Sequence, residues 1–296
     1  MRIYLVNINE WIIPVRGLRL LTQQGHEVGG NWLAPPLHHD LSDFDPDVIV
    51  YAPHRRDTAL RLGLETVRHA RTVLWALYPD YLTGWNHEQN THSEGPLEPV
   101  QELLPYFRAY LANSKFTKDL LEARSPGYTF EVCYLGIDTQ GIDAVNEGLR
   151  KADRPANVLW HHRWSVDKNL QTALTIILHL AKRHPDVVFY LGRKEDWDEV
   201  YWVPPSLKAF YVDVAAELEK VGNLQYAPRF ETQEEYWRFI GAADIAFSCS
   251  YHETFGIALL EQAYAHTACV APDRVVYPEV HAGALLVPPE EIEAGI

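Results

Sequence analysis

Short apolar, β-branched runs alternate with longer amphipathic segments along almost the whole chain of 296 residues. The runs have the length and composition of buried strands, and the segments between them have helical spacing. A parallel sheet with helices on both faces is the arrangement that such an alternation favours. The clearest expected strands are Arg2–Ile8, Asp47–Ala52, Thr72–Leu77, Asn157–Trp160, Val187–Leu191, Ile245–Ser248 and Ala268–Ala271, and the clearest expected helices are Phe116–Glu122, Asn169–Arg183 and Thr254–Ala265. The sequence therefore predicts an α/β fold.

The alternation is interrupted near Lys151–Pro155, where the chain becomes polar and contains a proline. We therefore predict one Rossmann-like domain over residues 1–152 and a second over residues 153–296, and the length of the chain suits two domains. Ligands of open α/β sheets bind outside the carboxyl ends of the strands. Two such domains in tandem therefore predict a ligand-binding cleft between them.

Acidic side chains outnumber basic ones, with 40 Asp and Glu against 26 Lys and Arg and a formal net charge of −14. Such a surface repels phosphate backbones at long range, so we do not expect nucleic acid as a partner. The three cysteines are widely spaced and form no CxxC pair, which argues against a disulfide framework or a zinc cluster. We see no signal-peptide pattern and no apolar run of membrane-spanning length, and we expect a cytoplasmic protein with no membrane span.

Two glutamates stand eight positions apart in the stretch Tyr251–Glu261, YHETFGIALLE. Thr254 is a good N-cap residue, so the helix is expected to begin there and to leave Glu253 in a loop at the carboxyl edge of the sheet. The free N–H groups and the dipole at the start of a helix favour a phosphate, and the missing Cβ of Gly256 lets a ligand approach the backbone. Glu261 can accept hydrogen bonds from vicinal hydroxyls such as those of a ribose, and Glu253 can do the same for a second sugar.

Two cations follow the first strand of the second half, in Trp160–Asn169, WHHRWSVDKN. Arg163 offers a bidentate fork and Lys168 a point charge, and both are expected at the same edge of the sheet as the glutamates. Two cations and a helix dipole can stabilise a departing nucleotide diphosphate without a metal. The two motifs together predict a nucleotide-sugar site.

Both motifs resemble those of the family-4 retaining glycosyltransferases, which have the GT-B fold of two Rossmann-like domains. His162-Arg163-Trp164 and Lys168-Asn169 stand where that family has Gly-Arg-Leu and Lys-Gly. The stretch from Glu253 to Glu261 matches its Glu-x-Phe-Gly-x-x-x-x-Glu pattern without a gap. The resemblance covers most of residues 110–288 and is weak before them. Within the family, HHRWSVDKN, HEQN at His87–Asn90 and the stretch Asp273–Glu279 look like the tRNA-queuosine mannosyltransferase group.

The resemblance implies a retaining, metal-independent glycosyltransferase that uses a UDP- or GDP-sugar as co-substrate, needs no other cofactor and acts on an acceptor that the sequence does not identify. Residues 1–152 would then bind the acceptor and residues 153–296 the donor. His92 is a second candidate beside His87, and both histidines also fit ordinary loop positions. The implied catalytic residues are Arg163, Lys168, Glu253 and His87, and the implied donor-binding residues are Trp164, Phe255, Gly256, Ile257 and Glu261.

Two departures from the family pattern affect these expectations. The family continues for several helices after the position of Val287, one of which returns to the first domain, whereas this sequence ends at Ile296. We therefore expect that the return helix is absent and that the donor domain is incomplete. The segment Asn7–Arg16 lacks the Gly-Gly pair that the family has near the acceptor, which leaves acceptor recognition open.

Other interpretations of the same residues are weaker. Asp43-Phe-Asp45 and Asp196-Trp-Asp198 spell the DxD pattern that holds a metal in other sugar transferases, but here they fit turns and polar loops. His87 and His92 are five positions apart, so they do not share the helix face that a zinc motif needs. A non-catalytic nucleotide-sugar or carbohydrate-binding relative with the GT-B fold is the alternative function, and a phosphorylase-like or epimerase-like protein of that fold is a further one.

Overall fold

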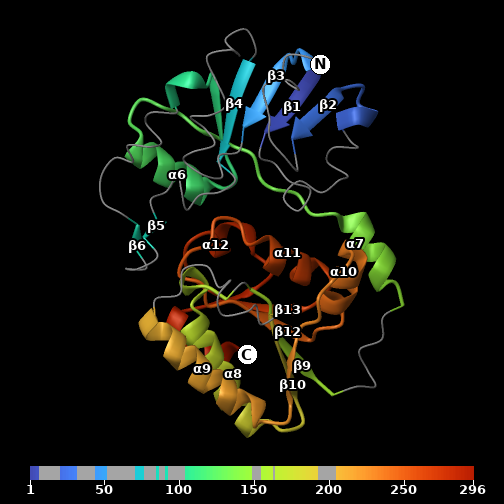
Figure 1. Cartoon of the computed structure of the whole chain (residues 1–296), viewed down its shortest axis with the longest axis vertical. Helices are drawn as coiled ribbons and strands as arrows, with labels where there is room; N and C mark the ends of the chain where they lie inside the picture. Colours follow the sequence, from blue (N-terminus) through green and yellow to red (C-terminus); the bar gives the residue numbers. More distant parts are fainter. Residues whose placement is uncertain are drawn as a thin grey trace. The chain divides into compact units, whose positions relative to one another are not determined.

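The chain forms two compact units, a first that ends at Asp138 and a second over Thr139–Ile296 (Figure 1). The computed structural model describes residues 1–6, 21–31, 44–51, 71–76, 85–86, 91–92, 104–148, 155–162, 164–192 and 205–296. Each unit is built around one six-stranded parallel sheet. The predicted α/β fold is thus confirmed in both halves of the chain.

The sheet of the first unit has the strand order β2-β1-β3-β4-β7-β8. Its core contains large side chains that are almost fully buried, among them Tyr51, Leu74 and Phe130. The helix α6 begins after Ser114, whose side chain accepts the N–H of Thr117. The described elements are β1 (Arg2–Val6), β2 (Glu27–Asn31), β3 (Val48–Tyr51), β4 (Arg71–Ala76), β5 (Trp85–Asn86), β6 (Thr91–His92), η2 (Leu104–Tyr106), β7 (Ala109–Ala112), α6 (Lys115–Arg124) and β8 (Glu131–Val132).

The sheet of the second unit has the strand order β11-β10-β9-β12-β13-β14. Its elements are α7 (Thr139–Asn146), β9 (Asn157–Trp160), η3 (Val166–Lys168), α8 (Leu170–Arg183), β10 (Val188–Leu191), α9 (Pro205–Glu219), β11 (Leu224–Tyr226), α10 (Gln233–Gly241), β12 (Ile245–Phe247), α11 (Ile257–Tyr264), β13 (Ala268–Pro272), α12 (Tyr277–Val280), β14 (Leu285–Val287), η4 (Pro289–Glu291) and α13 (Ile292–Gly295). All four residues of β9 are buried, as expected for a central strand with both faces covered.

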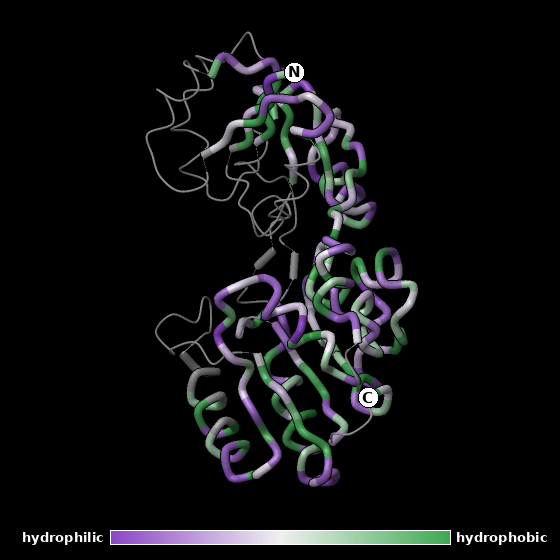
Figure 2. Tube along the Cα trace, turned by 90° about the vertical axis from the view of Figure 1, so that its right-hand side faces the viewer, coloured by the Kyte–Doolittle hydropathy of each residue, from purple (hydrophilic) through white to green (hydrophobic). Residues whose placement is uncertain are grey.

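The hydrophobic core of the second unit lies between β9, β10 and the inner face of α8. Trp160, Leu174 and Phe189 are among its fully buried members. Figure 2 shows hydrophobic residues concentrated along the strands of each unit and hydrophilic residues along many of the connecting loops. Because the strands themselves are apolar and buried, the loops at the carboxyl ends of the strands are where the polar side chains of a binding site can lie.

The strand order of the second sheet reverses between β9 and β12. From β9 the chain proceeds outward through β10 and β11, and it returns to β12 on the other side of β9. Loops that leave two such neighbouring strands run in opposite directions and open a crevice at the carboxyl edge. The loops after β9 and β12 contain Lys168 and Glu253, so the fold brings the two sequence motifs to the same crevice.

The predicted domain boundary after residue 152 falls in residues 149–154, which are outside the described residues. The division between the compact units comes earlier, after Asp138, because α7 packs against α10 and α11 of the second unit. The hydroxyl of Tyr264 on α11 donates to the Asp143 carboxylate on α7 over 3.1 Å. The sequence did not predict α7.

Candidate functional site

Lys168 and Glu253 form a buried ion pair at the point where the strand order reverses. The Lys168 Nζ lies 2.9 Å from Glu253 Oε2, 3.0 Å from the carbonyl oxygen of His252 and 3.4 Å from Asp167 Oδ2. The side chains of Lys168 and Glu253 are only 12% and 14% exposed. The ammonium that the sequence assigned to a diphosphate is thus held between two carboxylates in the described structure.

The other oxygen of Glu253 fills the turn before α11. Glu253 Oε1 accepts the backbone N–H groups of Thr254, Phe255 and Gly256 over 3.0, 3.3 and 3.0 Å. The expectation that α11 starts at Thr254 is therefore wrong. Gly256 is the N-cap and the helix begins at Ile257, because the three preceding residues turn around the carboxylate instead.

Opposing effects set the charge of Glu253. Burial by itself raises the pKa of this carboxyl, but the Lys168 ammonium and the backbone N–H groups outweigh it, and the pKa falls to about 2. Glu253 is therefore ionised at neutral pH. The ion pair is a permanent feature of the site until a ligand competes for one of its members.

Backbone contacts hold the two loops together. The N–H groups of Tyr251 and His252 donate to the carbonyl oxygen of Asp167 over 2.8 and 3.1 Å. Asn169, which follows Lys168, has φ 53 and lies in the left-handed region. Asparagine is one of the few residues besides glycine that adopt this conformation readily, so it can stand where related motifs have glycine.

Gly256 lies in a space that no side chain fits. Its φ is +77, and a Cβ at this position would lie 2.7 Å from the His281 Nε2. The same His281 nitrogen lies 3.0 Å from the carbonyl oxygen of Phe255. His281, which the sequence analysis did not single out, therefore supports the turn that presents the start of α11.

Glu261 is buried, and aromatic residues of α10 contact its carboxylate. The indole N–H of Trp237 donates to Glu261 Oε1 over 3.0 Å, and the Tyr236 hydroxyl also donates to this carboxylate. Burial and the Glu261 charge raise the pKa of Tyr236 well above its usual range, so its proton stays in place. The carboxylate that the sequence predicts to bind a ribose is thus oriented by Trp237 and Tyr236, which the sequence analysis missed.

If Glu261 binds the ribose of a nucleotide-sugar, as the sequence analysis expects, replacing Trp237 with phenylalanine should raise the KM for that donor by roughly tenfold while kcat changes little. The change keeps an aromatic ring but removes one hydrogen bond to a buried carboxylate, which is worth about 1.5–3 kcal/mol. Steady-state kinetics of the variant tests this. Trp164→Phe is the matched control, because the Trp164 indole N–H donates to the Gly192 carbonyl instead. An equal rise in KM in both variants would contradict the role of Trp237.

Burial keeps two histidines next to the ion pair neutral. Burial lowers the pKa of His161 to about 4, and burial together with the Lys168 charge lowers that of His162 to about 3. An unfolded histidine titrates near pH 6.5. Between these pKa values the unfolded chain binds more protons than the folded one, so the free energy of unfolding rises with pH. The contribution of these two histidines to stability is therefore fully present above pH 6.5 and is lost as the pH falls towards 3.

The variant His162→Gln is expected to lose part of this pH dependence. Each such histidine contributes a slope of about 1.4 kcal/mol per pH unit to the free energy of unfolding between about pH 4 and 6. Urea unfolding of the second unit, followed at several pH values in this range, should give a shallower slope for the variant. His266→Gln, at an exposed position, is the control. A slope that His162→Gln leaves unchanged would mean that the folded protein protonates this imidazole.

Several predicted site residues lie elsewhere or outside the described residues. Arg163 and His87 are outside the described residues, and His92 lies in β6 of the first unit. Trp164 is 2% exposed and belongs to the hydrophobic core. Ile257 is the first residue of α11, next to the turn around Glu253. Of the DxD pair, Asp45 lies at φ 47 and 3.7 Å from Arg2, whereas Asp43 and Asp196–Asp198 are outside the described residues.

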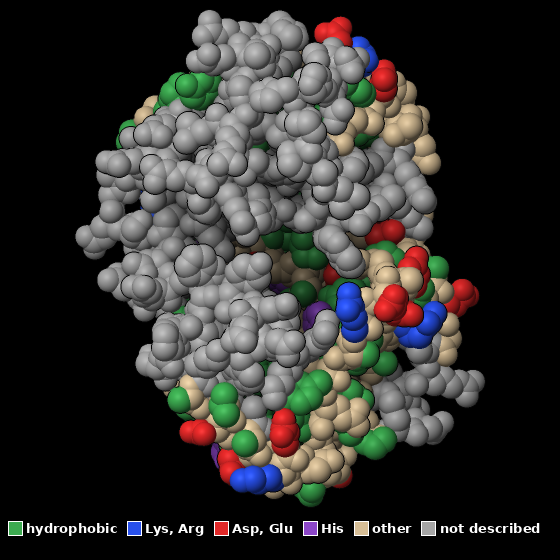
Figure 3. Space-filling view, in the orientation of Figure 1, with side chains coloured by type: hydrophobic (Ala, Val, Ile, Leu, Met, Phe, Trp, Pro, Cys, Tyr) green, Lys and Arg blue, Asp and Glu red, His purple; other side chains and the backbone are tan. Residues whose placement is uncertain are grey.

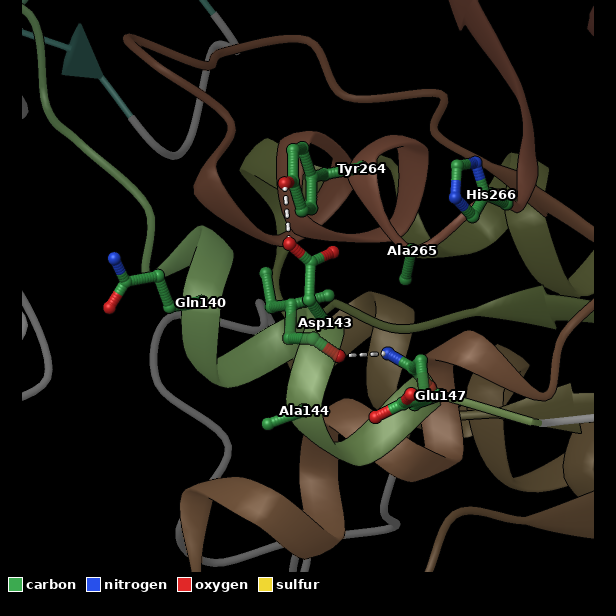
Figure 4. A pocket seen from close by; sticks show the side chains of 9 residues that line it. Gln140, Asp143, Ala144, Glu147, Tyr264, Ala265 and His266 are labelled. Carbon is green, nitrogen blue, oxygen red and sulfur yellow. Dashed lines mark hydrogen bonds between the residues drawn. The ribbon is translucent and has the colours of Figure 1, made fainter.

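A separate hollow of about 500 Å³ lies at the opposite end of α11 from Glu253. Figure 4 shows the Tyr264 side chain pointing to the Asp143 carboxylate on α7, with Glu147 just after the end of that helix. None of the residues around Lys168 lines it.

On the face drawn in Figure 3, the described Lys and Arg side chains are scattered among Asp and Glu side chains. Within the described residues, no helix is long and apolar enough to cross a membrane.

Comparison with known proteins adds a family and a fold. Residues 143–294, just over half of the chain, match the family model described as Glycosyl transferases group 1. A tRNA-queuosine alpha-mannosyltransferase of Drosophila melanogaster is 30% identical over 126 residues, which are 42% of this chain and 30% of that relative. The match thus spans less than a third of the relative's length.

Solved structures match over nearly the full chain at low identity. The sucrose-phosphate synthase of Thermosynechococcus elongatus has a TM-score of 0.73 and 15% identity, and the match covers 99% of this chain and 87% of that one. HepE of Anabaena, solved in complex with UDP and glucose, has a TM-score of 0.62 and 16% identity with the same coverage. At this identity the likeness concerns the fold.

Proposed function

Because the chain belongs to the glycosyl transferases group 1 family, we propose that it transfers a sugar from a nucleotide-diphosphate donor to an acceptor, with retention of the anomeric configuration and without a metal ion. Its fold is GT-B, as the resemblance implied. The observation that carries the proposal is the meeting of Lys168, Glu253 and the start of α11 at one edge of the second sheet. This edge supplies both the positive charge and the hydroxyl acceptors that a nucleotide-sugar needs.

The departing diphosphate is the group that needs stabilisation in this reaction. The Lys168 ammonium and the N–H groups before α11 are fixed donors in a largely buried site, where charge stabilisation is strong. Arg163 would add a bidentate cation. Support for a nucleotide donor comes from the fold relative HepE, which is solved with UDP.

The ion pair suggests how the donor enters. Glu253 occupies both the ammonium and the N–H groups that a phosphate would use. A bound diphosphate competes with it for both, and the displaced carboxylate then accepts hydrogen bonds from hydroxyls of the donor sugar. Glu261, oriented by Trp237, would bind the ribose.

The sugar transfer needs no reactant other than the donor and the acceptor. The bond between the anomeric carbon and the diphosphate oxygen breaks, and the acceptor oxygen attacks the same face of the sugar. The acceptor proton passes to the departing diphosphate, which serves as the base. This geometry retains the anomeric configuration.

A donor panel tests the proposal on the whole chain. It contains UDP-glucose, ADP-glucose and GDP-mannose, the last because the Drosophila relative is a mannosyltransferase. The assay measures free nucleotide with and without EDTA, and NMR of the released sugar or product identifies its anomer. We expect turnover of one donor, unchanged by EDTA, with the donor's anomer retained. Nucleotide binding without turnover of any donor would instead favour a non-catalytic binding protein.

A further inference from the structure

The geometry points to Arg274 as a specificity-determining residue that binds an anionic group, a carboxylate or a phosphate, carried by the donor sugar or by the acceptor. The inference rests on the proposed function, because it concerns the same edge of the second sheet. It assigns a role to a cation that belongs to neither of the two motifs for diphosphate and sugar.

Arg274 lies in the loop that follows β13, and β13 pairs with β12 on the side away from β9. The carboxyl edge of the sheet thus carries Lys168 after β9, Glu253 after β12 and Arg274 after β13. Glu253 stands between the two cations in this order. If the diphosphate lies on the Lys168 side and the sugar on Glu253, Arg274 lies on the far side of the sugar from the diphosphate, where a substituent of the sugar or the acceptor would come.

The guanidinium of Arg274 is fixed to the Glu253 loop itself. Its Nε and Nη2 donate to the carbonyl oxygen of Ser250 over 3.1 and 2.6 Å, and Nη2 also approaches the carbonyl oxygen of Cys249 at 3.5 Å. Its Cζ lies 5.0 Å from the centre of the Tyr251 ring. A guanidinium held in this way is pre-organised, so a ligand that binds it immobilises little more of the side chain.

The charge of Arg274 has no carboxylate partner among the described residues. Its hydrogen bonds to the described residues go to backbone carbonyls through Nε and Nη2, and none of them uses the two N–H groups of Nη1. The Arg274 side chain is half-buried, and this burial lowers its pKa. A half-buried cation without an anion gains more from an incoming carboxylate or phosphate than an exposed one does.

The backbone next to Arg274 is strained. Val275 has φ 50, a conformation that is rare and costly for a β-branched residue. An alternative role for Arg274 is purely structural, since its bonds to two carbonyls hold the Glu253 loop in place. That role does not require the charge to lack a carboxylate partner. It also predicts that the loss of the arginine weakens the binding of anionic and neutral ligands equally.

The test measures equilibrium binding by calorimetry for two pairs of probes that differ in one anionic group. UDP-glucuronate and UDP-glucose test the donor, and glucose 6-phosphate and glucose, titrated with UDP present, test the acceptor. We expect the wild-type chain to bind one anionic probe at least tenfold more tightly than its neutral partner. Arg274→Gln should remove most of this preference, and its affinity for UDP should fall by much less than its affinity for the anionic probe, because the loop that Arg274 bonds also leads to the diphosphate site.

Arg274→Lys keeps the charge and shows whether a lost preference reflects recognition or misfolding, since it should retain part of the preference. Arg183→Gln on α8, whose side chain is 60% exposed, controls for the loss of one positive charge. A wild-type chain that prefers neither anionic probe would overturn the inference, as would equal losses for anionic and neutral probes in Arg274→Gln. Failure to bind UDP itself would instead contradict the proposed function.

Discussion

Replacing Lys168 with alanine is expected to lower kcat for sugar transfer by about 10²–10³-fold. The ammonium is one of the fixed donors at the diphosphate, and removal of one such donor typically costs about 2.7–4 kcal/mol of transition-state stabilisation. Nucleotide release from the preferred donor, at saturating donor concentration, measures the effect. Lys220→Ala, which removes an exposed lysine just after the end of α9 that pairs with Glu217, is the matched control and should leave kcat unchanged.

The same variant is expected to be less stable at neutral pH. It leaves Glu253 and Asp167 close together without the cation between them, and removing one member of a buried pair costs roughly 3–5 kcal/mol. Lys168→Met keeps the volume of the side chain without the charge, so it shows how much of the lost stability comes from the missing charge and how much from lost packing. Turnover that survives in both variants, in protein shown to be folded, would remove Lys168 from the mechanism.

Replacing Gly256 with alanine is expected to lower the free energy of unfolding by about 2–3 kcal/mol. The left-handed conformation of this residue costs about 1–2 kcal/mol for an L side chain. The new Cβ would also lie 2.7 Å from the His281 Nε2, so the imidazole must move and lose its contact with the Phe255 carbonyl. A displaced start of α11 should in addition weaken UDP binding.

Two glycines separate the causes of this loss. Gly148 has the same φ of +77 but nothing within 4 Å of an added Cβ, so Gly148→Ala should cost only the backbone term of about 1–2 kcal/mol. Gly283 has neither feature, and Gly283→Ala should change stability by less than about 0.5 kcal/mol. If Gly256→Ala is no worse than Gly148→Ala, the contact with His281 does not constrain the turn.

The sequence predicted the elements that have a strong local pattern. The strand Asn157–Trp160 has the predicted bounds, and the strand and helix expected around Glu253 both exist. The meeting of Lys168 and Glu253 was also predictable, because parallel strands end at a common edge and each motif directly follows a strand. The place of each motif in the sequence, directly after a strand, was therefore enough to predict that the two residues lie close together.

What the sequence could not predict depends on contacts between distant segments. The start of α11 was misplaced because Thr254 has the chemistry of an N-cap, whereas the Glu253 carboxylate takes up the N–H groups. Trp237 lies 24 positions before Glu261, and no local pattern relates them. Arg274 stands in the stretch Asp273–Glu279 that resembles the mannosyltransferase group, so a hint existed without a role attached to it.

A structure of the chain bound to UDP tests the central claim most directly. The account predicts that the diphosphate lies within hydrogen-bond distance of Lys168 Nζ and of the N–H groups of Phe255 or Gly256. It also predicts that the ribose hydroxyls meet Glu261 and that Glu253 has left the ammonium. A diphosphate bound away from Lys168, with the pair between Lys168 and Glu253 intact, would contradict it.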